Sequence, residues 1–389
     1  MMRVLYIADP VEVGGASKSL VDVVTAMTRY GVECVVCTSV HGNIEKELKT
    51  VGVQCIADGH MAAMEVPPES KIKRIPVYVL RKLQYQKSLK RAMKIIETQI
   101  DMSTVDIIHT NSARNDLGCE LARKYSIPHI MHIREFGEED FGCWTYRRNY
   151  GKFLNDYTDT FICISNAIKA SWMQKGISSE KMSVIYNGVD EARINKIDTV
   201  KHYLTKELRM VIVGGVCEAK GQIEAIRAMA LLPKNVQANV YLDIIGWGNE
   251  NYIKQIEREI ESLGLRKNIN LLGAKDDVGE RLCNYQVGLM CSRAEGFGRV
   301  TVEYMHAGLG VIASKAGANE EIIENNVTGL LYKKGNAQAL ANKMREYFEN
   351  RNVLSRCAKK GREHAENNFT KSINAKNIYN IYVGLMAKK

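Results

Sequence analysis

RVLYIADPVEVGGASKSLVDVVTAM, at residues 3–27, predicts a strand, a glycine-containing loop and an amphipathic helix in direct succession. Apolar residues recur at helical spacing from Leu20 to Met27, and Gly31 is typical of a helix end. RMVIVGGVCEAKGQIEAIRAMALLP, at residues 209–233, repeats this plan. Two such beginnings predict two α/β domains.

The rest of the chain supports this organisation. Strand-like segments alternate with helical ones in both halves, which is typical of parallel sheets with crossover helices. A length of 389 residues also suits about two domains. We expect a first domain at 1–190, a linker at 191–208, a second domain at 209–370 and a last helix at 371–389 that can pack on the first domain.

The composition excludes several classes of protein. With 46% hydrophobic and 25% charged residues, the chain is globular rather than disordered. No apolar run reaches the length of a membrane span, and Asp9 interrupts the opening apolar residues, so a cytoplasmic protein is expected. The pair Cys34 and Cys37 resembles a metal or redox motif but has no second ligand pair nearby, which favours buried strand thiols.

Positive charge is concentrated rather than spread. The net charge is +10, and residues 71–94 carry nine cations without an acid. This segment predicts a helix after Pro76, and two interpretations stay open: a surface helix whose apolar side joins the core, or a face held on an anionic membrane. Nucleic acid is not expected as a partner, because no known binding module accompanies the charge. The candidate apolar positions are Leu80, Leu83, Leu89, Met93 and Ile96.

Gly14 and Gly15 follow the first predicted strand. Glycine there lets backbone amides approach an anion at the positive end of a helix. Neither the dinucleotide fingerprint G-x-G-x-x-G nor a P-loop is present, so the loop is interpreted equally well as a phosphate site or as a structural turn.

A second signal lies in CSRAEGFGRVTVEYMHAGLGVIAS at residues 291–314. A strand is expected to end near Ser292, and glycines then lead into a helix. The first amides of that helix have no partner within it and suit a diphosphate. These amides belong to Phe297, Gly298, Arg299 and Val300.

Two acids flank these amides. Glu295 lies in the loop before the helix, and Glu303 lies one turn after Arg299 on the same face. A carboxylate at position 303 can accept hydrogen bonds from two ribose hydroxyls, and Glu295 would face whatever lies beyond the diphosphate. The alternative is that both are solvated charges near a helix start, where acids are favoured anyway.

The spacing from Glu295 to Glu303 resembles the E-x7-E signature of the retaining, nucleotide-sugar-dependent glycosyltransferases of family 4. Their GT-B fold consists of two Rossmann-like α/β domains facing each other across a cleft, and the resemblance implies that fold here. It continues, in the family's order, through separated motifs, which together are far more specific than any one of them. The motifs are GGAS at 14–17, CISNAIK at 163–169, VIYNGVD at 184–190, VGGVCEAKGQ at 213–222, DIIGWG at 243–248, AGANEEII at 316–323 and TGLL at 328–331.

The resemblance also implies roles for individual residues. Lys220 would contact the donor diphosphate, Glu303 the ribose and Glu295 the donor sugar. An ammonium group neutralises the charge that builds on a leaving diphosphate, and helix-start amides add fixed dipoles. Gly15 and its neighbours would bring amides of the first domain to the same phosphate.

Two positions depart from the family's pattern. The family often has arginine where this chain has Gly215, so one cation of the expected donor site is missing, and Lys220, Arg299 or Arg293 would have to compensate. After the strand in PHIMHIRE, a histidine followed by an acid is common, whereas this chain has Arg134 and Glu135. Arg134 is then the preferred contact for donor sugar or acceptor, with His132 and Glu135 as weaker candidates.

The resemblance implies retention of anomeric configuration. Double displacement needs a carboxylate pair, but the acids from Glu135 to Asp140 are interpreted as a solvated acidic loop. Front-face substitution is therefore favoured, with the leaving phosphate oxygen taking the acceptor's proton. No cofactor is implied, and no metal is expected, because the chain has no Asp-x-Asp pair and cations with dipoles can replace one.

The sequence thus predicts an enzyme that moves a sugar from a nucleoside-diphosphate sugar to a carbohydrate or lipid-linked acceptor during assembly of a bacterial surface polysaccharide or glycolipid. It would be cytoplasmic, with peripheral contact to the inner face of the membrane left open. Two rivals remain: a catalytically silent binding or scaffold subunit of the same fold, which the missing arginine at Gly215 favours, and a nucleotide-sugar epimerase.

Overall fold

A computed structural model describes residues 1–387 apart from 12–13, 69, 139–141 and 198–199. The chain forms two compact units. Unit 1 comprises Met1–Gly188 together with Lys371–Lys389, and unit 2 comprises Val189–Thr370. No helix in the described part of the chain combines the length and the apolar character that a membrane crossing needs.

Unit 1 is built on a seven-stranded sheet in the order β3-β2-β1-β5-β6-β8-β9, and every neighbouring pair is parallel. A short antiparallel pair, β4 (Met64–Glu65) with β7 (Trp144–Thr145), lies outside it. The strands of the large sheet are β1 (Arg3–Ile7), β2 (Glu33–Thr38), β3 (Gln54–Ala57), β5 (Ile107–Thr110), β6 (His129–Ile133), β8 (Thr160–Cys163) and β9 (Met182–Val184).

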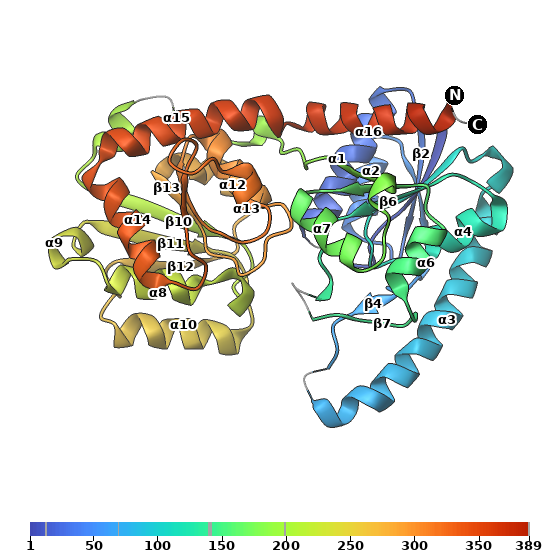
Figure 1. Ribbon diagram of the computed structural model, residues 1–389, viewed down its shortest axis with the longest axis horizontal. Helices are drawn as coiled ribbons and strands as arrows, with labels where there is room; N and C mark the ends of the chain where they lie inside the picture. The colour runs from blue at the N-terminus through green and yellow to red at the C-terminus, as the bar shows by residue number, and fades with distance from the viewer. Residues whose placement is uncertain (12–13, 69, 139–141, 198–199, 388–389) are drawn as a thin grey trace. The chain divides into compact units, whose positions relative to one another are not determined.

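Helices cover both faces of this sheet (Figure 1). One core cluster joins the sheet to α1 (Gly15–Arg29), α2 (Asn43–Lys49) and α16 (Lys371–Met386). The other joins it to α3 (Arg74–Gln99) and α4 (Leu117–Tyr125). Side chains of a strand alternate between these cores, so Cys34 packs in the first and Cys37 in the second. The two thiols are therefore buried strand residues, as the sequence predicted, and they lie on opposite faces of the sheet. The remaining helices of unit 1 include α6 (Tyr150–Asp156) and α7 (Asn166–Gln174).

Unit 2 has a six-stranded parallel sheet in the order β12-β11-β10-β13-β14-β15. Its strands are β10 (Leu208–Val213), β11 (Val240–Ile245), β12 (Ile269–Gly273), β13 (Val287–Met290), β14 (Gly310–Ser314) and β15 (Leu330–Tyr332). Its helices are α8 (Gln222–Ala230), α9 (Lys234–Gln237), α10 (Glu250–Ser262), α11 (Val278–Arg281), α12 (Arg299–Ala307), α13 (Asn319–Ile322), α14 (Ala337–Glu349) and α15 (Arg351–Asn368).

Both sheets follow the same winding rule. The chain starts in a middle strand, adds two strands on one side and then returns to the other side. Such a switch point leaves a crevice at the carboxyl ends of the strands, where doubly wound α/β folds bind ligands. The switch lies between β1 and β5 in unit 1 and between β10 and β13 in unit 2. The two Rossmann-like α/β domains predicted from the sequence are confirmed.

The stretch 191–208, expected as a linker, belongs to unit 2. Ile194, Ile197 and Tyr203 are buried there, and the Tyr203 hydroxyl donates a 2.5 Å hydrogen bond to the Gly308 carbonyl. Apolar side chains at these positions gain more from packing than from exposure, so the segment is held against its own domain rather than being free.

The basic helix also differs from expectation. A 3-10 turn at Lys71–Lys73 leads directly into α3 at Arg74, so Pro76 lies in the first turn, where its missing N–H costs no intrahelical bond. Ile96 is buried as predicted, but Leu80 and Leu83 are exposed. The interpretation in which the apolar side joins the core is therefore wrong for Leu80 and Leu83, while the interpretation as an exposed face stays open for them.

Candidate active site

Two loops meet at the switch point of unit 2. One follows β10 and includes a 3-10 turn at Glu218–Lys220, and the other follows β13. The backbone amide of Arg293 donates a 2.8 Å hydrogen bond to the Ala219 carbonyl, which joins the loops. A Cβ at Gly221 would lie 2.2 Å from the Cys291 carbonyl oxygen, so this approach requires glycine.

The junction brings Lys220 and Glu295 together. Lys220 Nζ lies 2.9 Å from Glu295 Oε2, and the two side chains are 35% and 13% exposed. A partly exposed ion pair adds little to stability. Its significance is positional, because the ammonium and the carboxylate can reach the same small ligand.

Glu295 also reaches the start of α12. Its Oε1 accepts a 3.2 Å hydrogen bond from the Gly298 amide. Gly298 has φ of 83° and precedes a helix that lacks a side-chain cap of its own. The expectation that the Gly298 amide is unpaired is wrong in this structure, because the carboxylate three residues earlier folds back onto it. Glu295 therefore serves the helix start and Lys220 at once.

The segment that follows β14 holds the backbone of the loop that carries Glu295. The Glu295 carbonyl accepts a 2.9 Å hydrogen bond from the Ala318 amide. A Cβ at Gly317, whose φ is +54°, would come within 2.1 Å of that carbonyl oxygen. Glycine at 317 thus lets the segment after β14 pass close behind Glu295 and hold its backbone in place.

Helix α12 presents its predicted site residues on one side. Arg299, Val300 and Glu303 are half-buried, whereas Thr301, Val302 and Tyr304 are buried against the domain. The Tyr304 hydroxyl accepts a 2.8 Å hydrogen bond from the Val213 amide at the end of β10. Phe297 packs inward, with its ring centroid 5.7 Å from that of Phe369. Sequence reasoning missed Tyr304, which ties the helix to the strand that leads to Lys220.

The surroundings of Gly215, where the family often has arginine, are well defined. No heavy atom lies within 4 Å of an ideal Cβ placed there, and the Gly215 carbonyl accepts a 2.9 Å hydrogen bond from Gln222 Nε2. The position therefore has room for a side chain. Arg293, one candidate for compensation, pairs instead with exposed Glu218 at 2.7 Å.

In unit 1, Arg134 follows β6 and is buried. Its Nη1 donates a 2.7 Å hydrogen bond to Asn187 Oδ1, and its Nε donates a 2.9 Å bond to Asn111 Oδ1. Nη2 lies 3.2 Å from His132 Nδ1. The guanidinium is thus oriented by three side chains. The two asparagines were not predicted as site residues, although Asn187 lies in the VIYNGVD motif and Asn111 directly follows β5.

Glu135 differs from the expected solvated loop. It is buried, and its Oε1 accepts hydrogen bonds from Ser112 Oγ at 2.9 Å and from the Arg114 amide at 3.1 Å. Its carbonyl accepts a 2.8 Å bond from Trp172 Nε1. The carboxylate connects the loops after β5 and β6, so the interpretation as a solvated acid is wrong for Glu135. Of the other acids in that run, Glu138 is exposed, and Glu139 and Asp140 lie outside the described residues.

His132 lies in a buried stack of rings. Its ring centroid is 5.5 Å from that of His109, whose Nδ1 is 2.5 Å from the Tyr382 hydroxyl. Burial, and then the positive charge of Arg134, hold the pKa of both histidines well below the usual value. The imidazoles are therefore neutral. Among the described residues, Nε2 of each histidine has no hydrogen-bond partner.

The glycine loop of unit 1 opens α1. Gly15 is the first helical residue, and Gly14 precedes it with φ of 124°, which favours glycine. Both are exposed, and the first turn contains no acid. These features keep the helix start accessible to an anion.

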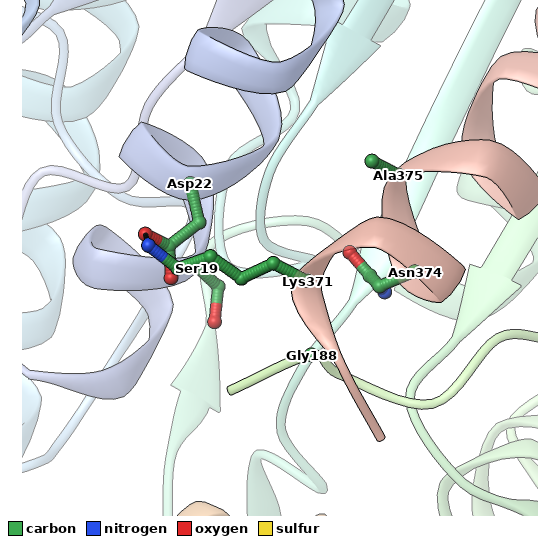
Figure 2. Close-up of a pocket in the computed structure, with 6 residues that line it drawn as sticks. All are labelled: Ser19, Asp22, Gly188, Lys371, Asn374 and Ala375. Carbon is green, nitrogen blue, oxygen red and sulfur yellow. Dashed lines mark ion pairs between the residues drawn. The ribbon is translucent and has the colours of Figure 1, made fainter. Parts of the chain in front are cut away.

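The described residues of unit 1 line a smaller and a larger hollow. The smaller, shown in Figure 2, lies where α16 meets α1, and its volume of about 10 Å³ suits one water. Lys371 Nζ and Asp22 Oδ1 form a 2.7 Å ion pair there, so this hollow is part of the α16 attachment. The larger hollow, of about 460 Å³, is lined by residues that include Thr145, Tyr150, Trp172 and Lys175. Trp172 connects it to Glu135.

No group of three or more His, Cys, Asp or Glu side chains that could hold a metal ion occurs in the ranges that the structure describes.

Comparison with protein families identifies the class. Residues 13–193 match the model described as Glycosyltransferase Family 4, and residues 195–364 match Glycosyl transferases group 1. The two models together match most of the chain, and with the two Rossmann-like sheets they show that it is a glycosyltransferase of GT-B type.

Individual relatives agree with this assignment. The chain is 28% identical over 336 residues to an uncharacterised glycosyltransferase of Methanocaldococcus jannaschii, covering 83% of this chain and 88% of the relative. It is 25% identical to the lipopolysaccharide core biosynthesis glycosyltransferase LpsE of Rhizobium meliloti, over 60% of this chain and 65% of the relative. The crystal structure of Anabaena HepE in complex with UDP-glucose superposes with a TM-score of 0.78 and 22% identity, covering 99% of this chain and all of HepE.

Proposed function

We propose that this protein transfers a hexosyl group from a nucleoside-diphosphate sugar to an acceptor hydroxyl, with retention of configuration, in the synthesis of a surface polysaccharide or glycolipid. One observation carries the proposal: Lys220 and Glu295 are paired beside the start of α12, at the ligand-binding switch point of unit 2. The biosynthetic setting is suggested by the role of LpsE in lipopolysaccharide core biosynthesis, and a nucleotide-sugar donor by the complex of HepE with UDP-glucose.

The donor diphosphate is assigned to Lys220 and the N-terminal turn of α12. An ammonium group and the positive end of a helix both stabilise negative charge. Lys220 would exchange part of its contact with Glu295 for the phosphate, which leaves the carboxylate to accept hydrogen bonds from the sugar. Glu303, half-buried on the same helix, would accept from the ribose.

The chemistry that fits these groups is substitution on one face of the sugar. The bond between the anomeric carbon and the phosphate oxygen breaks, and a bond to the acceptor oxygen forms on the same side. The acceptor's proton passes to the departing phosphate oxygen. Lys220 and the helix dipole stabilise the charge on that oxygen, a type of contribution worth about 10²–10³ in kcat. The residues supply this stabilisation by themselves, and the proposal includes no metal or cofactor.

The acceptor is assigned to unit 1. Arg134 is held by Asn111, Asn187 and His132, so its guanidinium has a fixed direction suited to a hydroxyl or a phosphate. The 460 Å³ hollow beside Glu135 has the volume of a small-molecule pocket. A carbohydrate acceptor or the head of a lipid-linked one fits this combination of aromatic and cationic lining.

The test begins with a thermal-shift screen of nucleoside diphosphates, since a ligand of the folded state raises the melting temperature. Nucleotide sugars of the base so identified are then incubated with the enzyme, and released nucleoside diphosphate is measured with and without acceptor saccharides. We expect Lys220→Ala to lower kcat about 10²–10³-fold. Lys360→Ala, which breaks an exposed pair with Glu363, is the matched control and should keep full activity.

The outcomes separate the rivals. Nucleotide binding without turnover of any donor would favour a silent GT-B subunit. Conversion of the donor to its epimer without acceptor would favour an epimerase. A product whose anomeric configuration, determined by nuclear magnetic resonance, is inverted would contradict the proposed retention.

A further inference from the structure

The first half of α3 exposes a stripe of large apolar side chains. Figure 1 shows this end of the helix extending beyond β4 and β7. Isolated exposed apolar residues are ordinary, but a contiguous apolar surface marks an interaction site. The stripe comprises Ile72, Ile75, Val79, Leu80 and Leu83, which are 91%, 78%, 53%, 56% and 53% exposed.

The stripe lies on a side of the helix that does not pack on unit 1. Positions 72, 75, 79 and 83 are three or four residues apart and therefore share one face. A different side holds the helix to the domain: the Tyr78 hydroxyl donates a 3.0 Å bond to the Thr145 carbonyl, and the Tyr85 hydroxyl donates a 2.6 Å bond to Asp116. Ala92 and Ile96 continue that inner side. Because these contacts attach a different side of the helix to unit 1, the apolar stripe is not part of the core of unit 1.

The exposed face becomes cationic where the apolar residues end. Lys87, Lys90 and Lys94 follow Leu83 at the same three- or four-residue spacing, and all three are exposed. Arg91 lies beside them and is exposed too. Within the described part of the chain, none of these four cations has an ion-pair partner. One helix face therefore combines an apolar end with unneutralised positive charge.

We propose that this face, residues 71–94, docks unit 1 on an anionic lipid bilayer. Its apolar side chains enter the boundary between headgroups and acyl chains, and its cations contact the headgroups. Amphipathic helices of this composition bind membranes through both contributions. The inference does not depend on the proposed reaction, since it concerns a surface of unit 1, whereas Lys220 and Glu295 belong to unit 2.

Charge decides against other occupants. A second copy docking through the same face would bring two sets of nine cations together without an acid in either segment, which is unfavourable. Nucleic acid would satisfy the cations but would leave the aliphatic stripe in water, because single-stranded nucleic acid stacks on aromatic rings. An anionic bilayer offers an apolar boundary for the stripe and negative headgroups for the cations.

The experiment is co-sedimentation of the full chain with vesicles of phosphatidylcholine alone or of equal parts phosphatidylcholine and phosphatidylglycerol. Binding is expected to the anionic vesicles and to weaken in high salt. Lys87→Gln, Lys90→Gln and Lys94→Gln should each lower the partition coefficient about fivefold. Ile75→Ser, Val79→Ser and Leu83→Ser should each lower it about tenfold. These side chains are exposed, so the melting temperature should stay unchanged.

A matched control replaces exposed apolar residues elsewhere on unit 1, using Val40→Ser, Val51→Ser and Val383→Ser, and should bind as the parent does. Three results would overturn the proposal. They are absence of binding to anionic vesicles, equal loss of binding in the control variant, and conversion of a dimer to a monomer by the α3 substitutions in analytical ultracentrifugation. A further outcome would assign the face to nucleic acid instead. In that case RNA would displace the protein from vesicles, and the variants with apolar substitutions would bind RNA as well as the parent does.

Discussion

Single residues determine how the charges of the site are arranged. Glu295 binds Lys220 through one carboxylate oxygen and the Gly298 amide through the other. One side chain thus sets both the position of the cation and the start of α12. A site organised in this way responds to changes at a single position, and two such positions allow direct tests.

Gly215 offers a gain-of-function test. An ideal Cβ there contacts nothing within 4 Å, so Gly215→Arg should fold normally. A cation near the proposed diphosphate should tighten nucleoside-diphosphate binding about tenfold, because a charge-assisted hydrogen bond contributes about 1.5–3 kcal/mol. Isothermal titration calorimetry of both proteins measures the change. Equal or weaker binding by the arginine variant would show that the diphosphate does not lie near position 215.

Arg134 offers a loss-of-function test. Lysine keeps the charge but cannot bond Asn111, Asn187 and His132 together, because its ammonium lacks the planar fork of arginine. Arg134→Lys is expected to lower kcat at least about tenfold while the donor KM stays near its parent value. Arg209→Lys, at an exposed pair with Glu207, is the control for the same chemical change. A changed donor KM with unchanged kcat would move Arg134 from the acceptor to the donor.

At the level of elements, α16 is bound to unit 1 by a buried polar cluster. The Tyr382 hydroxyl lies 3.0 Å from the Tyr6 hydroxyl and 2.5 Å from His109 Nδ1. The ring of Tyr379 stacks on Tyr30 nearer the surface, with centroids 4.7 Å apart. The helix is therefore attached by specific hydrogen bonds as well as by apolar packing.

Removing the buried hydroxyl tests this attachment. Tyr382→Phe should lower the free energy of unfolding of unit 1 by about 1–3 kcal/mol, because Tyr6 and His109 lose a partner inside the core. Scanning calorimetry measures the effect on the melting transition. Tyr379→Phe, which keeps the ring stack, should change stability much less. If both variants melt alike, the buried cluster does not secure the helix.

The sequence predicted the elements better than their contacts. Strand and helix order could be read from apolar spacing, because the central strands of these sheets are buried on both faces. Lys220 and Glu295 could be named as candidates because the resemblance to family 4 implies donor roles for both, and in the structure both follow strands at the switch point. Asn111 and Asn187 could not, since they approach Arg134 from positions 23 and 53 residues away. The outward direction of Leu83 depends in the same way on where Tyr78 and Tyr85 find partners.

At the scale of the whole molecule, buried neutral histidines make stability depend on pH. Burial lowers the pKa of His129 to about 3 and holds those of His109 and His132 well below their usual value. In the unfolded chain these groups titrate near about 6.5. As the pH falls below that value, the unfolded chain binds protons that the folded chain excludes, so stability declines on acidification.

The expected decline is about 1.4 kcal/mol per pH unit for each such histidine, below about pH 6.5 and above its folded pKa. Calorimetry between about pH 7.5 and about pH 5 should show falling melting temperatures, with a plateau on the alkaline side. His129→Gln should reduce the slope, because it removes one of these buried imidazoles. A slope that His129→Gln leaves intact would contradict the assignment.

Because α16 follows unit 2 in the chain but packs on α1, unit 1 is assembled from segments on either side of unit 2. A ribosome that has translated residues 1–188 has made every strand of the first sheet but none of the helix that covers Tyr6. The face of that sheet on which α16 packs therefore stays partly uncovered while unit 2 is synthesised. Nascent chains should therefore gain protease resistance in unit 2 before unit 1 reaches its final resistance, the reverse of the order in which the two sheets are encoded.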